Sequence, residues 1–393
     1  MTPLLTGLRV LDLTSVIYGP LIGQILGDLG ADVVKVEPPE GDIARGVHPV
    51  GPAGIGAMYA NNNRNKRSVR LDLKTAAGRA ALARLVPWCE VLVHNMRPEA
   101  IARLGFDFAA CSAMNPRVIY LAAVGFGRGG PEAGRPAFDD VIQAASGLAG
   151  LPLARGDAPG YVNGVMADKV AALTATYGVL AAVAARARGR DGPIEVEAAM
   201  FESVAAFVLN EHLAACSFGA PPEQVGYHRM FAPDRRPFRT ADGWIGALPY
   251  TEAQWRRLLL HFGRADIADS GWFRDATERS RRVAELYAWL AEVMPRHATA
   301  EWLALLGRLD IPHARVNALP DLLTDPHLAA VGFFDPNGLE AAGQARAIRQ
   351  PVLFPGLDAR PDRPAPALGA DTEAVLREAG CSPEEIAAVI GAP

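Results

Sequence analysis

The first forty residues alternate between extended and helical patterns, and this alternation constrains the fold more than any other feature of the chain. Residues 8–13 (LRVLDL) and 31–36 (ADVVKV) are apolar and β-compatible, and residues 19–29 between them have a helical pattern. Pro20 in the first helical turn and Gly30 just after the last one match the usual asymmetry of helix ends. A strand, a helix and a strand at this spacing form a βαβ unit, which implies a parallel sheet.

The alternation continues to about residue 216, so we assign residues 1–216 to the N-terminal part of a large α/β domain. Residues 127–164 are rich in glycine and proline. They predict a long ordered loop that carries one short helix near residues 139–148. Further strands are predicted at residues 70–73, 90–94, 118–124 and 194–196, and further helices at residues 75–85, 98–104, 170–185 and 200–216.

A smaller α+β domain is predicted at residues 238–325, after a linker at residues 217–237 that is rich in glycine, proline and charge. The dipeptide Asp242-Gly243 is a strong hairpin signal. Residues 326–393 are interpreted as a return segment and the C-terminal part of the large domain. Within these regions we expect amphipathic helices at 252–262, 279–294 and 299–308, an extended piece at 350–354, a proline-rich crossing at 359–368 and a final helix at 371–379.

Composition indicates a soluble globular enzyme, because half of the 393 residues are hydrophobic and about a fifth are charged. Lysine and arginine are scattered and the formal net charge is −4, which argues against nucleic acid or a membrane surface as partner. The four cysteines form no C-x-x-C pair, so neither a metal site nor disulfides are expected and the cytoplasm is the expected compartment. Residues 170–185 are the longest apolar run, too short to span a bilayer, and are interpreted as a core helix.

Asp168 precedes this apolar run, where a buried carboxylate is costly unless it has a function. Aspartate is among the best helix N-caps, and the local sequence favours this role. The positive end of the helix would also favour an ionised carboxylate that attacks an electrophile. The eight histidines are dispersed, and the chain has no H-E-x-x-H or G-x-S-x-G motif. Asp168 is therefore the candidate nucleophile.

Loops at the carboxyl ends of the predicted strands are candidates for binding a nucleotide. Residues 14–19 join the first strand to the first helix, a place where loop amides and helix N-termini hold phosphates. Several polar side chains follow other strands, and their positive charges and amide group would bind phosphates in the same place. The residues concerned are Val16 to Tyr18, Lys74, Asn95, Arg97 and Arg103.

The segment Gly125–Gly130 formally matches G-x-G-x-x-G after a predicted strand. A dinucleotide site requires these glycines to open a helix, with an acidic residue about 20 positions further on. Here Pro131 and Pro136 follow, and Asp139 comes too early. A flexible glycine-rich active-site loop is the better interpretation.

Several segments in order along nearly the whole chain carry a resemblance to a known family. They are GLRVLDLTSVIYGP, LGADVVKVEPPEGD, NRNKRSVRLDLK, NMRPEAIARLGFD, NPRVIYLAAVGFGRGGP, RPAFDDVIQAASGL, GVMADKVAAL, YGVLAAVAAR, FRTADGW, LDIPHARVN, DPHLAAVGFF and APALGADTEAVL. Together they resemble the class III CoA-transferases of the CaiB/BaiF type, a family that also contains carnitine and formyl-CoA transferases and the α-methylacyl-CoA racemases.

The resemblance implies a large Rossmann-type domain whose parallel sheet is built from N- and C-terminal parts, a smaller domain, and an interlocked homodimer. It implies a coenzyme A thioester and a carboxylic acid as substrates, with no permanently bound cofactor. The family's catalytic aspartate falls on Asp168, and transfer would pass through an aspartyl mixed anhydride and an aspartyl-CoA thioester. The implied coenzyme A contacts are Val16, Ile17, Tyr18, Leu71, Lys74, Asn95, Met96, Arg97, Arg103, Pro136, Ala137, Phe138 and Asp139.

Two positions distinguish branches of this family. The racemases carry a catalytic histidine where this chain has Phe138, and phenylalanine cannot move a proton, so a transferase is favoured over a racemase or isomerase. Formyl-CoA transferases carry a glutamine where this chain has Ile17 and a glycine-run loop that is not found here. Both hydrophobic residues favour an acyl group less polar than oxalate. An inactive coenzyme A-binding protein is the third alternative.

Overall fold

The computed structural model describes residues 3–334, 346–356 and 363–391. Contacts divide the chain into two compact units: residues 1–149, 161–208 and 327–393 form the large unit, and residues 150–160 and 209–326 form the small unit. Residues 150–160 and 209–216 thus group with the small unit, whereas we expected them in the large domain.

A six-stranded parallel sheet forms the centre of the large unit, which confirms the predicted mixed α/β fold. The spatial order β3-β2-β1-β4-β5-β6 changes direction between β1 and β4. Ligands of such sheets bind outside the carboxyl ends of the strands at this change of direction. The strands are β1 (Arg9–Leu13), β2 (Asp32–Glu37), β3 (Lys66–Arg70), β4 (Val91–His94), β5 (Ile119–Val124) and β6 (Ile194–Ala199).

Helices pack on the sheet and its edge. α1 contacts α7, and α7 also contacts β5 and β6; α3, α17 and α18 contact one another. The short helices α2, α5 and α18 were not expected from the sequence. The helices are α1 (Tyr18–Asp28), α2 (Ala57–Asn63), α3 (Ala76–Trp88), α4 (Pro98–Leu104), α5 (Phe108–Met114), α6 (Asp139–Ala145), α7 (Met166–Ala187), α8 (Met200–His212), α17 (Thr372–Glu378) and α18 (Pro383–Ile390).

The predicted strand at residues 70–73 is wrong, because β3 lies at Lys66–Arg70. Val33 of β2 pairs with Lys66, and Glu37 pairs with Arg70. Lys66 has a fully buried side chain that is paired with a carboxylate, so a charged residue occupies a position that sequence patterns reserve for apolar ones. Leu71, which directly follows the end of β3, is buried as well. Its apolar side chain is the reason the strand was predicted too far along the chain.

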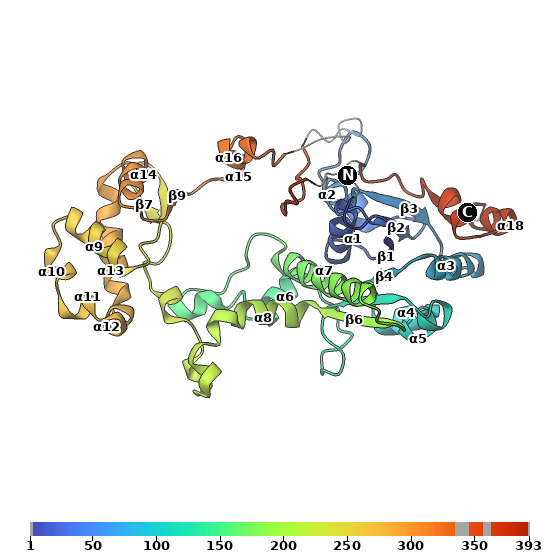
Figure 1. The fold of residues 1–393 in the computed structure, drawn as a ribbon, viewed down its shortest axis with the longest axis horizontal. Helices are drawn as coiled ribbons and strands as arrows, with labels where there is room; N and C mark the ends of the chain where they lie inside the picture. Colours follow the sequence, from blue (N-terminus) through green and yellow to red (C-terminus); the bar gives the residue numbers. More distant parts are fainter. Residues whose placement is uncertain (1–2, 335–345, 357–362, 392–393) are drawn as a thin grey trace. The chain divides into compact units, whose positions relative to one another are not determined.

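The C-terminal part joins the large unit through helices, and none of its described residues forms a strand of the six-stranded sheet, contrary to expectation. Asp371 N–H donates to the carbonyl of Ser68, and Ser68 N–H donates to the Asp371 carboxylate at 2.8 Å. These two hydrogen bonds satisfy the backbone groups of Ser68 at the edge of β3, where a seventh strand would otherwise pair. Residues 350–354 form no strand, and part of the crossing at 359–368 lies outside the described residues. Figure 1 shows α18 beside α3.

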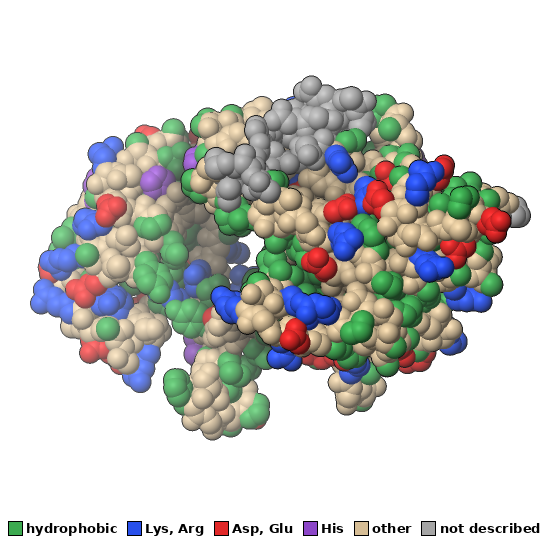
Figure 2. Space-filling model, turned by 45° about the vertical axis from the view of Figure 1, so that its right-hand side comes forward, with side chains coloured by type: hydrophobic (Ala, Val, Ile, Leu, Met, Phe, Trp, Pro, Cys, Tyr) green, Lys and Arg blue, Asp and Glu red, His purple; other side chains and the backbone are tan. Residues whose placement is uncertain are grey.

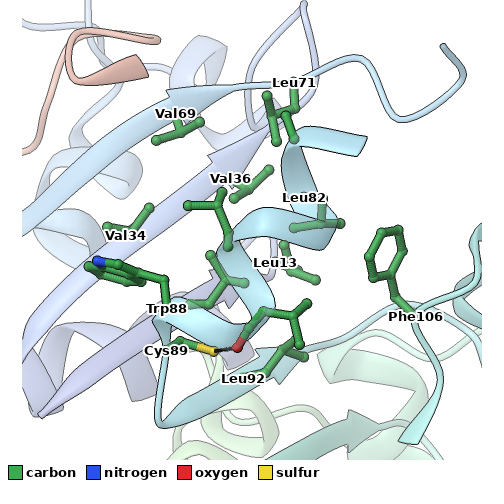
Figure 3. Close-up of a cluster of buried hydrophobic side chains, with 14 of the residues drawn as sticks. Leu13, Val34, Val36, Val69, Leu71, Leu82, Trp88, Cys89, Leu92 and Phe106 are labelled. Carbon is green, nitrogen blue, oxygen red and sulfur yellow. Dashed lines mark hydrogen bonds between the residues drawn. The ribbon is translucent and has the colours of Figure 1, made fainter. Parts of the chain in front are cut away.

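One face of the sheet packs into a large hydrophobic core. Side chains from the first three strands meet Leu82 and Trp88 of α3, and Val375 and Leu376 of α17 join the same cluster. Central parallel strands that are covered on both faces consist of nearly continuous apolar residues, which explains why most of them were recognisable in the sequence. Figure 3 shows this cluster with Leu13, Val34, Val36, Val69, Leu71, Leu82, Trp88, Cys89, Leu92 and Phe106 labelled.

Helix α7 is longer than the expected helix at residues 170–185, with 22 residues from Met166 to Ala187. By length and composition alone it is apolar enough to cross a membrane, a test that a core helix also meets. Ala171, Ala175 and Val179 are buried on one face of the helix, whereas Leu173 and Tyr177 are exposed. The small residues permit α1 to approach closely.

The small unit has its own sheet and core. β7 (Phe238–Arg239), β8 (Trp244–Ala247) and β9 (His313–Arg315) form an antiparallel sheet, and β7 and β8 form the hairpin predicted at Asp242-Gly243. Its core contains buried Trp255, Phe273, Tyr287 and Trp302. Its helices are α9 (Glu252–His261), α10 (Ala265–Ala268), α11 (Gly271–Arg274), α12 (Ala276–Arg281), α13 (Val283–Val293), α14 (Thr299–Arg308) and α15 (Leu319–Leu322), and α16 (Pro326–Ala330) follows where the chain returns to the large unit.

Charged side chains are distributed over the surface much as they are along the sequence. On the face in Figure 2, lysine and arginine side chains (blue) are interspersed with aspartate and glutamate side chains (red). Most of the described ion pairs involve an exposed arginine, as in Arg84–Glu385 and Arg117–Asp191. Such exposed pairs contribute little to stability. The charges that determine the architecture are buried.

Two buried lysines connect the sheet to the loop after β1. Lys66 Nζ lies 2.8 Å from Asp12 Oδ2 and donates to the carbonyl of Pro20 at the start of α1, also at 2.8 Å. Lys35 Nζ lies 3.0 Å from Asp42 Oδ2 and donates to the carbonyl of Thr14 at 2.7 Å. Burial lowers the pKa of Lys66 to about 8, and the charge of Asp12 offsets part of this effect. Lys66 therefore remains charged at neutral pH.

Replacing Lys66 with methionine is expected to lower the free energy of unfolding by about 3–5 kcal/mol, because the Asp12 carboxylate would be left buried without its partner. Urea unfolding of the purified protein measures this change. The control is Arg84→Gln, which breaks the exposed pair with Glu385 and should cost less than about 1 kcal/mol. Equal effects of the two substitutions would contradict the assignment.

Candidate active site

The loop between β1 and α1 is held in an unusual conformation at the point where the sheet order changes direction. Val16 has φ 74°, a left-handed conformation that is rare for a β-branched residue. Its N–H group lies 3.2 Å from both carboxylate oxygens of Asp42. Asn95, just after β4, accepts from Ser15 N–H at 3.1 Å and donates to the Ser15 carbonyl at 2.9 Å. The loops after β1 and β4 are thus joined.

Two adjoining cavities open along these loops. The larger has a volume of about 550 Å³ and lies between the segments after β1, β2, β3 and β4; the smaller, of about 280 Å³, extends to residues 134–138. Ser15, Ile43, Asn95 and Met96 line both cavities, so the two form a continuous surface. Among the expected coenzyme A contacts, Leu71, Lys74, Asn95, Met96 and Arg103 line the larger cavity, and Val16, Asn95, Met96, Arg97, Pro136, Ala137 and Phe138 line the smaller one.

The other expected contacts, Ile17, Tyr18 and Asp139, are buried and line neither cavity. Ile17 precedes the first residue of α1. Tyr18 donates from its hydroxyl group to the Ala198 carbonyl at 2.7 Å, so its side chain reaches β6. Burial raises the pKa of Tyr18, and nearby Asp168 and Glu197 raise it further. The phenol is therefore neutral and lies close to the candidate nucleophile.

Asp168 is the third residue of α7, and it does not cap the helix. The N-cap is Val165, which provides no side-chain hydrogen bond. The acceptor comes instead from another helix: Asp139 of α6 accepts a hydrogen bond from Asp168 N–H at 2.9 Å. The interpretation of Asp168 as an N-cap is therefore wrong. It failed because the groups that satisfy a helix end can come from residues distant in sequence.

The environment of Asp168 disfavours its ionised form. Its exposed fraction is 9%. Burial and the charge of Asp139 raise the pKa of Asp168 from 3.8 to about 7, and Lys169 opposes this shift. We expected the positive end of the helix to stabilise the anion, but desolvation outweighs that effect here. Asp168 is consequently a far more basic carboxylate than an exposed aspartate, and it is partly ionised at neutral pH.

The glycine-rich segment Gly125–Gly130, predicted to be a flexible active-site loop, is hydrogen-bonded to neighbouring elements. Gly127 N–H donates to Glu202 Oε1 at 3.0 Å, and Arg128 N–H donates to Glu197 Oε1 at 2.9 Å. The Arg128 side chain also pairs with Glu195 at 2.7 Å and with Glu197. Carboxylates of β6 and α8 thus determine the position of this loop. Glu195 in the predicted strand at residues 194–196 and Glu197 directly after it were the available signal.

Comparison with known proteins identifies the chain. The family model described as "CoA-transferase family III" matches residues 5–372. The chain belongs to CoA-transferase family III. It is 29% identical over 386 residues to a succinate–glutarate CoA-transferase of Agrobacterium fabrum, covering 96% of each chain. It is 33% identical to a probable fatty acyl-CoA transferase of Mycobacterium tuberculosis over 77% of this chain and 79% of the relative.

The fold agrees with solved structures of the same family. The crystal structure of a CaiB/BaiF family protein from Brucella suis has a TM-score of 0.81 and 28% sequence identity, and the match covers 96% of this chain and all of the other. This family III member is therefore an enzyme of the CoA-transferase class. The described residues contain no group of three or more histidine, cysteine, aspartate or glutamate side chains that could hold a metal ion.

Several residues that shape the site of this CoA-transferase were not found from the sequence. Gln143 is fully buried and donates to Asp139 Oδ2 at 2.6 Å. Asp42 holds both Val16 N–H and Lys35. Both lie in segments that resemble the family, but nothing in the sequence marks these two side chains as part of the site, because their partners include residues distant in sequence, Val162 for Gln143 and Val16 for Asp42. The only signal available in the sequence was a polar residue within an otherwise apolar or turn segment.

Replacing Asp168 with asparagine is expected to stabilise the enzyme by about 2–4 kcal/mol at about pH 8. The folded-state pKa of about 7 lies above the ordinary 3.8, so ionisation costs folding free energy as the pH rises through this window. The gain is therefore absent near pH 4, grows up to about pH 7 and is constant above it. Urea unfolding at several pH values measures it, with exposed Asp140→Asn as control. A gain that does not depend on pH would contradict the raised pKa.

Proposed function

We propose that this CoA-transferase moves coenzyme A from an acyl-CoA thioester to a carboxylic acid through covalent intermediates on Asp168. The observation that supports this most strongly is a buried carboxylate with a pKa of about 7 at the start of α7. A basic carboxylate is a better nucleophile toward a thioester than an ordinary one, and it is ionised often enough at neutral pH to react. The family membership supports transfer as the overall reaction.

In the proposed first half-reaction, the Asp168 carboxylate attacks the thioester carbonyl of the donor. A C–O bond forms, the C–S bond breaks, and coenzyme A leaves as the thiolate, which produces a mixed anhydride. The thiolate then attacks the Asp168 carbonyl and expels the donor acid, which leaves an aspartyl-CoA thioester. In the second half-reaction the acceptor carboxylate attacks this thioester and the same steps run in reverse to give the new acyl-CoA.

We infer that the two adjoining cavities hold the coenzyme A part of the substrate. Lys74 and Arg103 line the larger cavity and Arg97 lines the smaller one, so they could neutralise the phosphate charges. The cavity of about 280 Å³ extends to Phe138, the residue before Asp139 on α6. The thioester would therefore be delivered toward α6 and the start of α7. The anchored loop Gly125–Gly130 would exclude water from the anhydride.

The identity of the acids is proposed from the relatives and from one side chain. One relative is named for succinate and glutarate and another for fatty acyl groups. Phe138 has an exposed fraction of 65% and lines the smaller cavity. Its apolar ring favours an acyl chain longer and less polar than oxalate. We propose succinyl-CoA, glutaryl-CoA and longer acyl-CoA donors as the first substrates to screen against a panel of carboxylic acids.

Replacing Asp168 with alanine is expected to abolish transfer while leaving coenzyme A binding nearly unchanged, because the larger cavity lies on other elements. Mass spectrometry of the wild-type enzyme after mixing with acyl-CoA should find an adduct on Asp168, and hydroxylamine should trap the same residue. Asp140→Ala, at an exposed neighbouring acidic position, is the control for folding and charge. A fully active Asp168→Ala enzyme would end the proposal.

We further propose that two chains form an interlocked homodimer and that the enzyme is cytoplasmic. Large apolar side chains are exposed in a single chain, among them Leu173 and Tyr177 of α7, Phe207 of α8 and Phe218, which is 93% exposed. Leu173 and Tyr177 are four residues apart and so lie on the same side of α7, and an exposed apolar helix face is typical of a protein interface. A second copy of the chain would cover it.

Light scattering coupled to size-exclusion chromatography is expected to give twice the mass of one chain. The double substitution Leu173→Glu and Tyr177→Glu should abolish the dimer, because it would bury charges in an apolar interface. Ile390→Glu, at an exposed position on α18, is the matched control and should remain dimeric. A wild-type protein that elutes as a monomer at micromolar concentration would contradict the homodimer.

A further inference from the structure

The carboxylates of Asp139 and Asp168 both lie at the start of α7, and the Asp168 N–H group of this helix end donates to the Asp139 carboxylate. Asp139 Oδ1 accepts the hydrogen bond from Asp168 N–H at 2.9 Å. The N–H groups in a first helical turn have no partner within the helix and carry partial positive charge. The backbone group of Asp168 that could stabilise an anion is therefore directed at the carboxylate of Asp139.

Gln143 holds Asp139 from one turn further along α6. Its Nε2 donates to Asp139 Oδ2 at 2.6 Å and lies 3.2 Å from the Gly164 carbonyl, and its Oε1 accepts from Val162 N–H at 2.9 Å. Gln143 has no exposed surface. With both ends of its amide occupied, the side chain cannot turn over. It therefore joins α6 to the segment that leads into α7 and fixes the Asp139 carboxylate.

We propose that the side chain of Asp139 is a positioning residue for the transfer reaction: it holds the first turn of α7 in place, and its negative charge opposes ionisation of Asp168. This inference rests on the proposed role of Asp168 as the nucleophile. It gives the Asp139 carboxylate a function of its own, beyond the contact with coenzyme A that the family resemblance implies for this position.

Other charged and titratable groups near Asp168 come from three elements. Lys169 of α7 favours the ionised form of Asp168. Tyr18 of α1 lies close to both Asp168 and Glu197 of β6. The charge of Glu197 is paired with Arg128. After burial, Asp139 makes the largest contribution that raises the pKa of Asp168, so removing the charge of Asp139 is the substitution that tests the proposal directly.

The charge of Asp139 also favours one direction of opening of the mixed anhydride. Attack of the coenzyme A thiolate at the Asp168 carbonyl forms the aspartyl-CoA C–S bond and expels the donor carboxylate. Attack at the donor carbonyl regenerates the donor acyl-CoA and expels the Asp168 carboxylate. The weaker base leaves more readily. Ordinary carboxylic acids have a pKa of about 4, whereas burial and Asp139 raise that of Asp168 to about 7, so Asp139 favours opening toward aspartyl-CoA.

The test compares Asp139→Asn with Asp140→Asn, which removes the same charge from the exposed next residue of the same helix. In Asp139→Asn the acidic limb of the kcat/KM profile should move to lower pH by about one unit or more. The fraction of enzyme that carries coenzyme A on Asp168, measured by intact-protein mass after mixing with donor and no acceptor, should fall several-fold. Asp140→Asn should change neither quantity.

A second variant tests the positioning role separately. Gln143→Met keeps a similar volume but removes the hydrogen bonds that fix Asp139. It should lower kcat by about 10–100-fold while KM for the acyl-CoA changes by less than about 3-fold, because a small displacement of a nucleophile costs rate rather than binding. An unchanged kcat in a folded Gln143→Met enzyme would overturn the positioning role.

An unchanged acidic limb together with an unchanged coenzyme A-bound fraction in Asp139→Asn would overturn the electrostatic role. If Asp139→Asn does not fold, as judged by circular dichroism, Asp139→Ser removes the charge and keeps an acceptor oxygen. Infrared difference titration, with Asp168→Asn as the blank, follows protonation of Asp168 without turnover. If the wild type transfers no acid, the proposed function fails, and the infrared midpoint in Asp139→Asn still decides whether Asp139 acts on Asp168.

Discussion

Two buried lysines of the large unit, Lys35 and Lys66, hold the loop after β1 that lines both cavities. Neither side chain has exposed surface. A buried charge is tolerated only when its partners are in place, and these partners include Thr14 and Pro20, which flank the loop after β1. Each lysine therefore connects one end of this loop to the sheet. A loop at the edge of a parallel sheet, which is ordinarily mobile, becomes a fixed wall of the cavities.

The strain at Val16 is a consequence of the same constraint. A residue in a sparsely populated backbone region costs about 1–3 kcal/mol and persists only when its surroundings determine its conformation. Here the Asp42 carboxylate accepts a hydrogen bond from Val16 N–H and also pairs with Lys35. The same carboxylate therefore holds the strained residue and the buried lysine. Asn95 joins the adjacent Ser15 to the loop after β4. The strain thus lies at the point where both cavities meet.

Much of the sheet was predictable because its central strands are covered on both faces and consist of apolar residues. β3 was misplaced because its first residue, Lys66, is a buried charge that resembles a surface residue in the sequence. The C-terminal part was expected to add to the sheet, but Asp371 satisfies the edge of β3 with a side chain and one N–H group. Such contacts between residues 303 positions apart leave no periodic signal.

The candidate site was predictable only in part, for a related reason. The loop positions at strand ends follow from topology, and Asp168 follows from its place before a buried helix together with the family resemblance. Its electrostatic environment does not follow, because Asp139 and Gln143 are separated from it by a long loop. The helix end therefore suggested a stabilised anion, whereas the fold supplies a second carboxylate. Pairs of buried acids are recognised only once the chain is folded.

Helix α6 joins the smaller cavity to the candidate nucleophile. Phe138, which precedes it, is 65% exposed and lines the smaller cavity, and the next residue, Asp139, is buried and holds Asp168 N–H. Adjacent residues at the start of a helix point in different directions. Phe138, which would contact the acyl group, is therefore only one peptide bond away from Asp139, which holds the candidate nucleophile. Displacement of this wall by an ill-fitting acyl group would be transmitted to α7. Selection among acids would then appear in the rate of attack more than in binding, because a nucleophile displaced by about 1 Å loses rate steeply.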